Sequence, residues 1–200
     1  MAHPSERIHA HHHAVQFYGN EESLFTTVGG FLSEGLVAGQ PAIIIATEPH
    51  RQAIVDQLTA RLIDVEHARE IGDLVLLDAH EALSMFMVGD VPDPTAFETH
   101  FGDLMTRILN GRTRSVIRAY GEMVDVLWKE GRTEAAIKLE IMWNKLATAY
   151  QFALLCAYAM GNFYKQAEQF QEVCRQHTVV MDTDTNVVVF EQPKRAVRTA

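Results

Sequence analysis

The chain has 200 residues, of which 48% are hydrophobic and 22% charged, and its formal net charge is −9. This length suits one domain with a sizeable core. The negative charge argues against nonspecific nucleic-acid binding, which needs clustered Lys and Arg. The longest apolar runs, such as residues 42–46, are too short to span a membrane, and the polar start lacks the apolar stretch of a secretory signal. We therefore expect a cytoplasmic protein that binds neither membranes nor nucleic acid directly.

Apolar segments alternate with helical patterns along the chain. Strands are expected at residues 14–18, 42–46, 74–78, 115–120 and 152–158. Helices are expected between these strands. The first begins after the potential N-cap Asn20, and the second begins near Pro49. Later helices are expected around residues 97–108, 122–128, 133–150 and 163–174. Such alternation is typical of an α/β fold with a largely parallel sheet and helices on both faces.

The two ends of the chain differ from this pattern. Residues 1–13 predict a disordered lead that ends in several histidines, and residues 178–190 carry two Val-rich runs that predict a C-terminal β-hairpin. A basic tail with Lys194, Arg195 and Arg198 follows and is interpreted as a solvated end. The expected organisation is thus a lead at 1–13, one domain at 14–177, and a terminal hairpin with tail at 178–200.

Common catalytic and metal-binding patterns are missing from the sequence. The first predicted strand leads into Gly19, Asn20, Glu21 and Glu22, and because the chain has no Gly-Lys pair, a standard phosphate-binding loop is excluded. Cys156 lies in an apolar strand, where a raised pKa favours a core role over a nucleophile, and neither it nor Cys174 has metal-type spacing. The lead histidines are suitable metal ligands, but a flexible tail explains them equally. We expect no enzyme activity, no metal site and no cofactor.

Several polar residues follow the predicted strands, where ligands of parallel α/β sheets bind. The candidate ligand-binding residues at these positions are Tyr18, Thr47, His50, Arg51, Asp78, Glu122 and Tyr158. Glu140 and Asn144 lie one helical turn apart beside the apolar stripe of their helix and are further candidates. For Glu122 and for the Glu140–Asn144 pair, the alternative is a structural role in holding neighbouring backbone.

An apolar run within residues 82–94 suggests a lid over the site. Phe86 and Met87 lie in this run, which Gly89 closes, and Met adapts well to irregular apolar ligands. The two residues are therefore candidate ligand contacts. The alternative is that the run packs the end of a short helix.

Seven segments of the chain together resemble the MEDS family, the methanogen and methylotroph sensory domains named from DcmR-type regulators. They occur in the family's order between about His13 and His177: HAVQFY, GLVAGQPAIIIAT with PHR, LVLLDA, FMVGDVPDP, YGEMVDVLW, LEIMWNKLA and LLCAY. The residues that match the family's motifs are His13, Tyr18, His50, Arg51, Asp78, Glu122, Glu140, Asn144, Cys156 and Tyr158. The resemblance transfers no catalytic role to any of them.

The resemblance implies a diverged RecA/KaiC-like three-layer domain. In that comparison residues 14–18 match the strand before the phosphate loop, whose Gly-Lys-Ser/Thr is lost. Residues 115–120 match the strand that normally delivers the Mg²⁺-binding Asp, but Arg118 and Ala119 stand near that place. The resemblance therefore implies a catalytically degenerate NTPase scaffold that is reused for binding.

The family resemblance also implies a function and its partners. We expect a non-catalytic sensory domain that binds a small, hydrocarbon-derived effector and signals to a separate histidine kinase or transcription regulator. One alternative is a partner-binding or homo-oligomeric adaptor without a ligand. Another is residual nucleotide binding, with His50, Arg51 and Arg118 contacting phosphate, since Arg binds phosphate as a planar fork.

Overall fold

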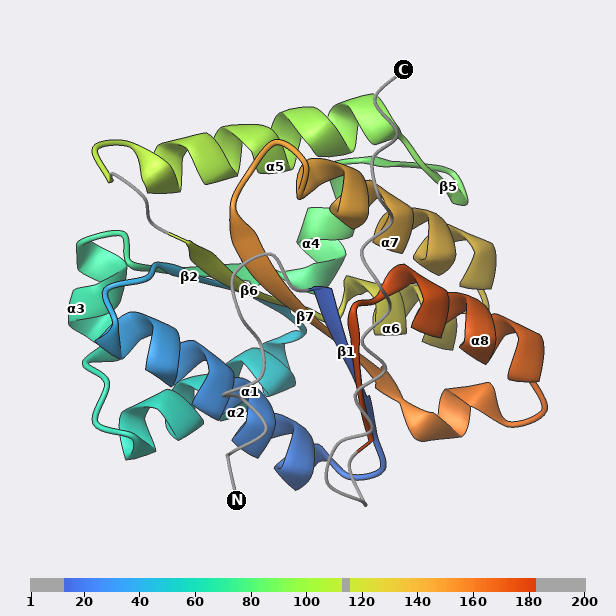
Figure 1. The fold of residues 1–200 in the computed structure, drawn as a ribbon, viewed down its shortest axis with the longest axis horizontal. Helices are drawn as coiled ribbons and strands as arrows, with labels where there is room; N and C mark the ends of the chain where they lie inside the picture. Colours follow the sequence, from blue (N-terminus) through green and yellow to red (C-terminus); the bar gives the residue numbers. More distant parts are fainter. Residues whose placement is uncertain (1–12, 113–115, 183–200) are drawn as a thin grey trace.

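Buried apolar strands form the centre of the fold. The computed structural model describes residues 13–112 and 116–182, and Figure 1 shows their arrangement. Six strands form one parallel sheet in the order β3-β2-β6-β7-β1-β8. Their bounds are β1 His13–Tyr18, β2 Ala42–Ala46, β3 Leu74–Asp78, β6 Ile117–Gly121, β7 Phe152–Ala159 and β8 Val179–Asp182. The expected α/β class with a parallel sheet is confirmed.

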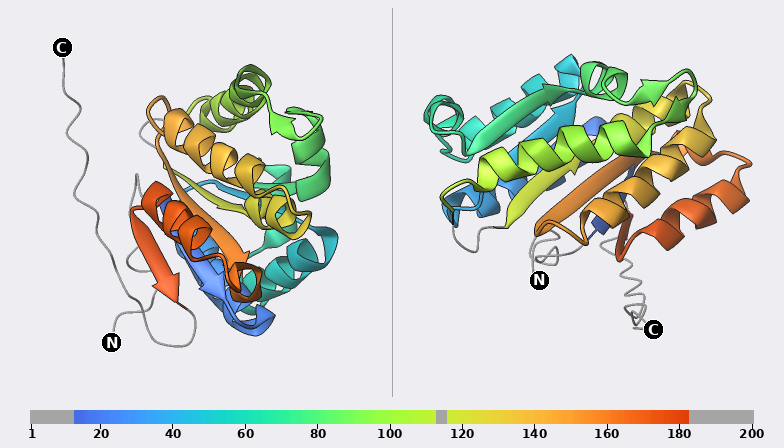
Figure 2. Two further views of the ribbon diagram at one scale, coloured as in Figure 1. Left: turned by 90° about the vertical axis from the view of Figure 1, so that its right-hand side faces the viewer. Right: turned by 90° about the horizontal axis from the view of Figure 1, so that it is seen from above.

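Helices cover both faces of this sheet, as Figure 1 and the two views of Figure 2 show. One face packs against α1 Glu21–Val37, α2 Glu48–Ala60 and α3 Val65–Glu70. The other packs against α4 Ala79–Ser84, α5 Pro94–Leu109, α6 Met123–Lys129, α7 Thr133–Leu146 and α8 Ala167–Gln176. A short antiparallel pair, β4 Met87–Val88 and β5 Val91–Pro92, lies between α4 and α5, and the 3₁₀ helix η2 Met160–Phe163 follows β7.

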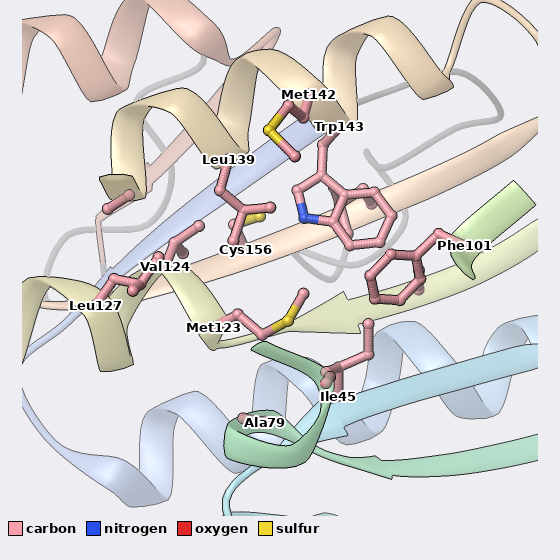
Figure 3. Close-up of a cluster of buried hydrophobic side chains, with 14 of the residues drawn as sticks. Ile45, Ala79, Phe101, Met123, Val124, Leu127, Leu139, Met142, Trp143 and Cys156 are labelled. Carbon is pink, nitrogen blue, oxygen red and sulfur yellow. The ribbon is translucent and has the colours of Figure 1, made fainter. Parts of the chain in front are cut away.

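Alternating side chains along each strand supply the two cores. In β1, Val15 and Phe17 join the core beneath α4–α8, whereas Ala14 and Tyr18 join the core beneath α1–α3. Figure 3 shows the larger core, where Phe101 and Trp143 approach from helices that pack on the sheet. Their ring centroids are 4.8 Å apart. Both faces of the sheet are therefore apolar, which explains the continuous apolar runs of its strands.

The carboxyl ends of the central strands are the natural place for a site. The loops after β1 and β2 lead to helices on one face, whereas those after β6 and β7 lead to the other. Because β1 lies beside β7, and β2 beside β6, the loops after neighbouring strands lead to opposite faces, which is where ligands of parallel α/β sheets bind. Asn20 caps the helix after β1 by accepting a hydrogen bond from Ser23 N at 2.8 Å, which confirms its expected role.

Only the first strand of the expected C-terminal hairpin lies within the described residues, so the hairpin stays a prediction. The first Val-rich run forms β8, which extends the sheet by pairing in parallel with β1, an arrangement that the sequence did not predict. His13, which was expected to end the disordered lead, is instead the buried first residue of β1. The rest of the lead, Ser115, the second Val-rich run and the basic tail lie outside the described residues. Helix α7 ends at Leu146, earlier than expected, and residues 147–150 form a turn. None of the described helices has the length and apolar character needed to cross a membrane.

Phe101 tests the larger core. Its ring is fully buried, so Phe101→Ala should lower the free energy of unfolding by about 3–5 kcal/mol through lost burial and a residual cavity. The matched control is Ile141→Ala on α7, whose side chain is 49% exposed and whose loss should cost no more than about 0.5 kcal/mol. Urea unfolding followed by circular dichroism measures both changes. Equal effects of the two substitutions would contradict this packing.

Candidate functional site

A buried carboxylate lies at the carboxyl end of β6. Glu122 is 4% exposed, and its Oε1 accepts a hydrogen bond from Thr47 N at 2.5 Å. Its Oε2 lies 2.6 Å from His50 Nδ1 and accepts a hydrogen bond from Tyr120 Oη at 3.2 Å. Since Thr47 follows β2 and His50 lies in the first turn of α2, this one carboxylate joins two neighbouring strand ends.

His50 connects that carboxylate with the protein surface. Its Nε2 lies 3.4 Å from Oε1 of Glu21, an exposed residue in the first turn of α1. Its ring also packs edge-on against Phe25, with centroids 5.1 Å apart. The imidazole thus links α2 with α1 and with the end of β6.

The hydrogen bonds shift both pKa values toward the charged forms. Hydrogen bonding to Glu122 raises the pKa of His50 against the opposing effect of burial, and Glu21 adds to the rise. Burial alone would raise the pKa of Glu122, but hydrogen bonds from His50 and Thr47 outweigh it and lower the pKa. Both shifts favour the imidazolium–carboxylate form of the pair.

A second buried carboxylate lies beside the first. Asp125, 3% exposed, accepts a hydrogen bond from Tyr18 Oη at 3.1 Å and pairs with Lys129 Nζ at 2.8 Å. Its Oδ1 accepts from Ala159 N at 3.0 Å and from Asn162 Nδ2 at 2.6 Å. The sequence analysis missed Asp125, although an acid inside the apolar segment MVDVLW is a usable signal for a buried polar role.

These groups form one site, which we name the carboxyl-edge cluster and define as Tyr18, Thr47, His50, Glu122 and Asp125. Its members follow β1, β2 and β6, and Asp125 reaches the end of β7. The cluster brings carboxylate acceptors together with imidazole, phenol and amide donors at the carboxyl edge of the sheet. This arrangement is suited to binding a small polar group.

Arg51 and Asp78 lie one strand further along the same edge. Arg51 Nη1 donates to Asp78 Oδ2 and to Ala46 O, both at 3.1 Å, so it ties the ends of β2 and β3 together. Asp78 also caps α4 by accepting from His80 N and Glu81 N. Both residues line an open cavity of about 450 Å³ between α2, α3 and the start of α4. They are therefore accessible to a ligand but separate from the buried carboxylates.

Glu140, Asn144 and Tyr158 gather elsewhere. They lie beneath α7, where Glu140 is fully buried and its Oε1 accepts a hydrogen bond from Tyr158 Oη at 2.9 Å. His13, Cys156 and His177 complete this group; the first two are candidate pocket residues through the family motifs, whereas His177 was not predicted. We name His13, Glu140, Cys156 and His177 the buried His–Glu–Cys cluster, whose possible ligand atoms all lie within 4.8 Å of one another.

The predicted lid residues have different environments. Phe86 is 1% exposed, and its ring packs edge-on against Phe97 at 5.2 Å, so it belongs to the hydrophobic core. This burial supports the packing alternative for the apolar run. Met87 is half-buried on β4 at the edge of the same core. A contact of either residue with a ligand stays a prediction.

The fold and the site define an α/β domain with polar groups gathered at the carboxyl edge of its sheet. The chain belongs to the MEDS family, the MEthanogen/methylotroph, DcmR Sensory domain, whose model matches residues 12–178. Membership supports a sensory role in general. Among solved structures, an uncharacterized protein from Pyrococcus horikoshii, crystallised in complex with an unknown peptide, is similar with a TM-score of 0.66 and 13% identity. The alignment covers 94% of this chain and 86% of that one, and at this identity it shows the fold alone. No curated protein matches the sequence.

The His50–Glu122 pair predicts a pH-dependent stability. The contribution of Glu122, whose pKa is lowered, is present above its ordinary value of 4.5 and is lost as the pH falls through the folded-state pKa. The contribution of His50 to stability is present when the pH is below its ordinary pKa of 6.5. Because its pKa is raised in the folded state, this contribution is lost as the pH rises through the folded-state pKa. The destabilisation by Glu122→Gln should therefore be greatest between pH 4.5 and 6.5.

Unfolding midpoints across this pH range, together with NMR titration of the His50 ring, measure the effect. In Glu122→Gln the pKa of His50 should fall, because the hydrogen bond to the Glu122 carboxylate is the largest effect that raises it, while Glu21 still faces the ring. A His50 titration that is the same in both proteins would contradict the ion pair.

Proposed function

We propose that this protein is a non-catalytic sensory domain that binds a small, hydrocarbon-derived molecule at the carboxyl-edge cluster. The observation that carries the proposal is Glu122, a buried carboxylate held by His50 and Thr47 N at the diverging loops of β2 and β6. The family to which the chain belongs supports the sensory part of the proposal.

The ligand chemistry follows from the groups at the cluster. A hydroxyl or amine can donate to Glu122 in place of His50, while a short apolar part contacts Phe25, which is half-buried beside the imidazole. Because His50 also faces Glu21, its displacement alters the contact between α1 and α2. We infer that this change between helices is the signal passed to a partner.

The absence of catalysis is part of the same proposal. We infer a diverged RecA/KaiC-like scaffold whose phosphate site is lost. The N-terminus of α1 is capped by Asn20 and carries Glu21 and Glu22 in its first turn, and these carboxylates oppose an anionic ligand there. Arg118 lies at the start of β6, where it donates to Gln40 Oε1 at 2.8 Å and Phe31 O at 2.9 Å, so it is remote from the carboxyl edge. This placement argues against the phosphate role considered for Arg118.

The output requires a partner, and we propose a cytoplasmic histidine kinase or transcription regulator. Three large apolar side chains near β4 and β5 are exposed: Met85 at 56%, Val88 at 69% and Val91 at 50%. Exposed apolar groups of this kind favour a protein contact. The same observation supports the second candidate function, an adaptor or homo-oligomer that needs no ligand.

Binding at the cluster is tested with methanol, methylamine, formate and acetate as probes, and with ATP and Mg²⁺ for the nucleotide alternative. Amide chemical shifts of the ¹⁵N-labelled protein should move for Thr47, His50 and Gly121 on addition of at least one organic probe. Glu122→Gln should weaken that binding by about tenfold or more, because a charged hydrogen-bond acceptor contributes about 1.5–3 kcal/mol. Calorimetry measures the change.

Glu98→Gln is the matched control, since Glu98 is an exposed α5 carboxylate paired with Lys145. It should leave the affinity unchanged. Shifts confined to residues away from the carboxyl edge, or equal effects of the two Glu→Gln substitutions, would contradict the proposed site. Micromolar ATP binding would favour the nucleotide alternative instead.

A further inference from the structure

Four chemically reactive side chains meet in the interior beneath α7 and α8. They come from separate parts of the chain: His13 from the start of β1, Glu140 from α7, Cys156 from β7 and His177 from the residue after α8. All are buried, with exposed fractions of 6%, 0%, 1% and 2% in that order. Figure 3 shows Cys156 on the sheet beneath Leu139 of α7, so the group is enclosed by the larger core. The carboxyl-edge cluster uses none of these residues.

The spacing of the four side chains matches a tetrahedral metal site. His13 Nε2 lies 3.1 Å from Glu140 Oε2 and 3.4 Å from Cys156 Sγ. Cys156 Sγ is 3.5 Å from Glu140 Oε2, and His177 Nε2 is 3.4 Å from Glu140 Oε1. Zinc bonds of about 2.0–2.3 Å at tetrahedral angles place neighbouring ligand atoms about 3.3–3.7 Å apart. The observed distances lie close to that range.

The histidine tautomers direct lone pairs into the cluster. His177 Nδ1 lies 2.7 Å from Val173 O, and because a carbonyl oxygen only accepts, Nδ1 must carry the proton. Asn144 Nδ2 donates to Gln176 O at 2.9 Å, which orients Asn144 Oδ1 as the acceptor for His13 Nδ1, also at 2.9 Å. When the two imidazoles are neutral, as metal binding requires, Nε2 of each is therefore the acceptor that faces the cluster. A second contact that fixes the tautomer is characteristic of metal-binding histidines.

The cluster has too few protons for its acceptors. With both imidazoles neutral, both Nε2 atoms and both carboxylate oxygens of Glu140 are acceptors, whereas only the Cys156 thiol and the Tyr158 hydroxyl are donors. His177 Nε2 in particular is fully buried and has no hydrogen-bond partner. A buried atom of this kind needs a partner, since an unsatisfied polar group costs about 1–3 kcal/mol. A cation between the four ligands provides it.

We propose that His13 Nε2, a carboxylate oxygen of Glu140, Cys156 Sγ and His177 Nε2 bind one divalent zinc ion. Two neutral imidazoles, one thiolate and one carboxylate are ligands that zinc accepts, and their summed charge of about −2 neutralises the ion within an apolar core. On binding, the Cys156 S–H bond breaks, its proton leaves to solvent, and the sulfur lone pair forms the S–Zn bond.

All four protein ligands are enclosed, so the site is structural rather than catalytic. It would join β1 and β7 to the two helices that cover them, and its loss would release β1 and the segment that leads into β8. The zinc ion therefore acts as a cross-link between the ends of the domain. This role is independent of the small-molecule site, so the failure of one proposal leaves the other standing.

The test uses the full chain, expressed without an affinity tag, stripped of metal with a chelator and reloaded with Zn²⁺ or Co²⁺. A background variant combines four substitutions near the N-terminus, His3→Ala, His9→Ala, His11→Ala and His12→Ala, so that these histidines do not bind metal. Elemental analysis after gel filtration should give about one zinc per chain in this background, as expected for one tetrahedral site. The Co²⁺ form should show intense tetrahedral d–d bands and a thiolate-to-cobalt charge-transfer band.

Cys156→Ser should abolish the charge-transfer band, whereas Cys174→Ser, which removes the half-buried thiol on α8, should keep it. His177→Gln should lower the bound zinc at least tenfold, and the chelator should lower the Tm of the reloaded background protein by several degrees. The Co²⁺ spectrum of the unsubstituted cluster is decisive even if Cys156→Ser fails to fold. Less than one tenth of a zinc per chain, or a Co²⁺ spectrum without thiolate ligation, would overturn the proposal and indicate an imidazolium–carboxylate pair instead.

Discussion

The need to satisfy the buried carboxylate of Glu122 constrains the carboxyl edge of the sheet. A charged group taken out of water is stable only when it is paired and hydrogen-bonded. Thr47 N and His50 provide these contacts from the loop after β2 and the start of α2, and Tyr120 provides another from β6. The position of α2 relative to the sheet therefore depends on an interaction that a polar ligand can replace. This dependence is the physical basis of the sensory proposal.

The two polar clusters have different relations to solvent. The carboxyl-edge cluster reaches the surface through His50 and the exposed Glu21, so a molecule can compete for its hydrogen bonds. The buried His–Glu–Cys cluster is enclosed by the core, and we propose that it binds a cation there. We infer that the hydrogen bonds of the carboxyl-edge cluster change when a molecule binds, whereas the contacts of the buried His–Glu–Cys cluster stay fixed. The buried His–Glu–Cys cluster joins β1 and β7, which lie side by side in the sheet. Tyr18 lies at the carboxyl end of β1, and Asp125 accepts hydrogen bonds from it and from Ala159 N at the end of β7.

Much of the fold could be predicted because its signals are local. Runs such as residues 42–46 are apolar and β-branched, and they form strands covered on both faces. The parallel pairing of β8 with β1 could not be predicted, since pairing between distant strands leaves no local pattern. The candidate site was predicted only in part, because local patterns indicate which residues follow strands but do not indicate which distant residues meet. Glu122, His50 and Thr47 follow strands and meet as expected, whereas Glu140 meets His13 and His177 through contacts that only the tertiary fold creates.

The central claim is that a small molecule is recognised at the carboxyl edge. It is tested most directly by a crystal structure of the protein purified under mild conditions that retain bound ligands, compared with a crystal soaked in a binding probe. The account predicts non-protein electron density within hydrogen-bonding distance of Glu122 or His50, with the His50–Glu122 contact lengthened. Density for the bound molecule at another place, with the 2.6 Å contact unchanged, would contradict it.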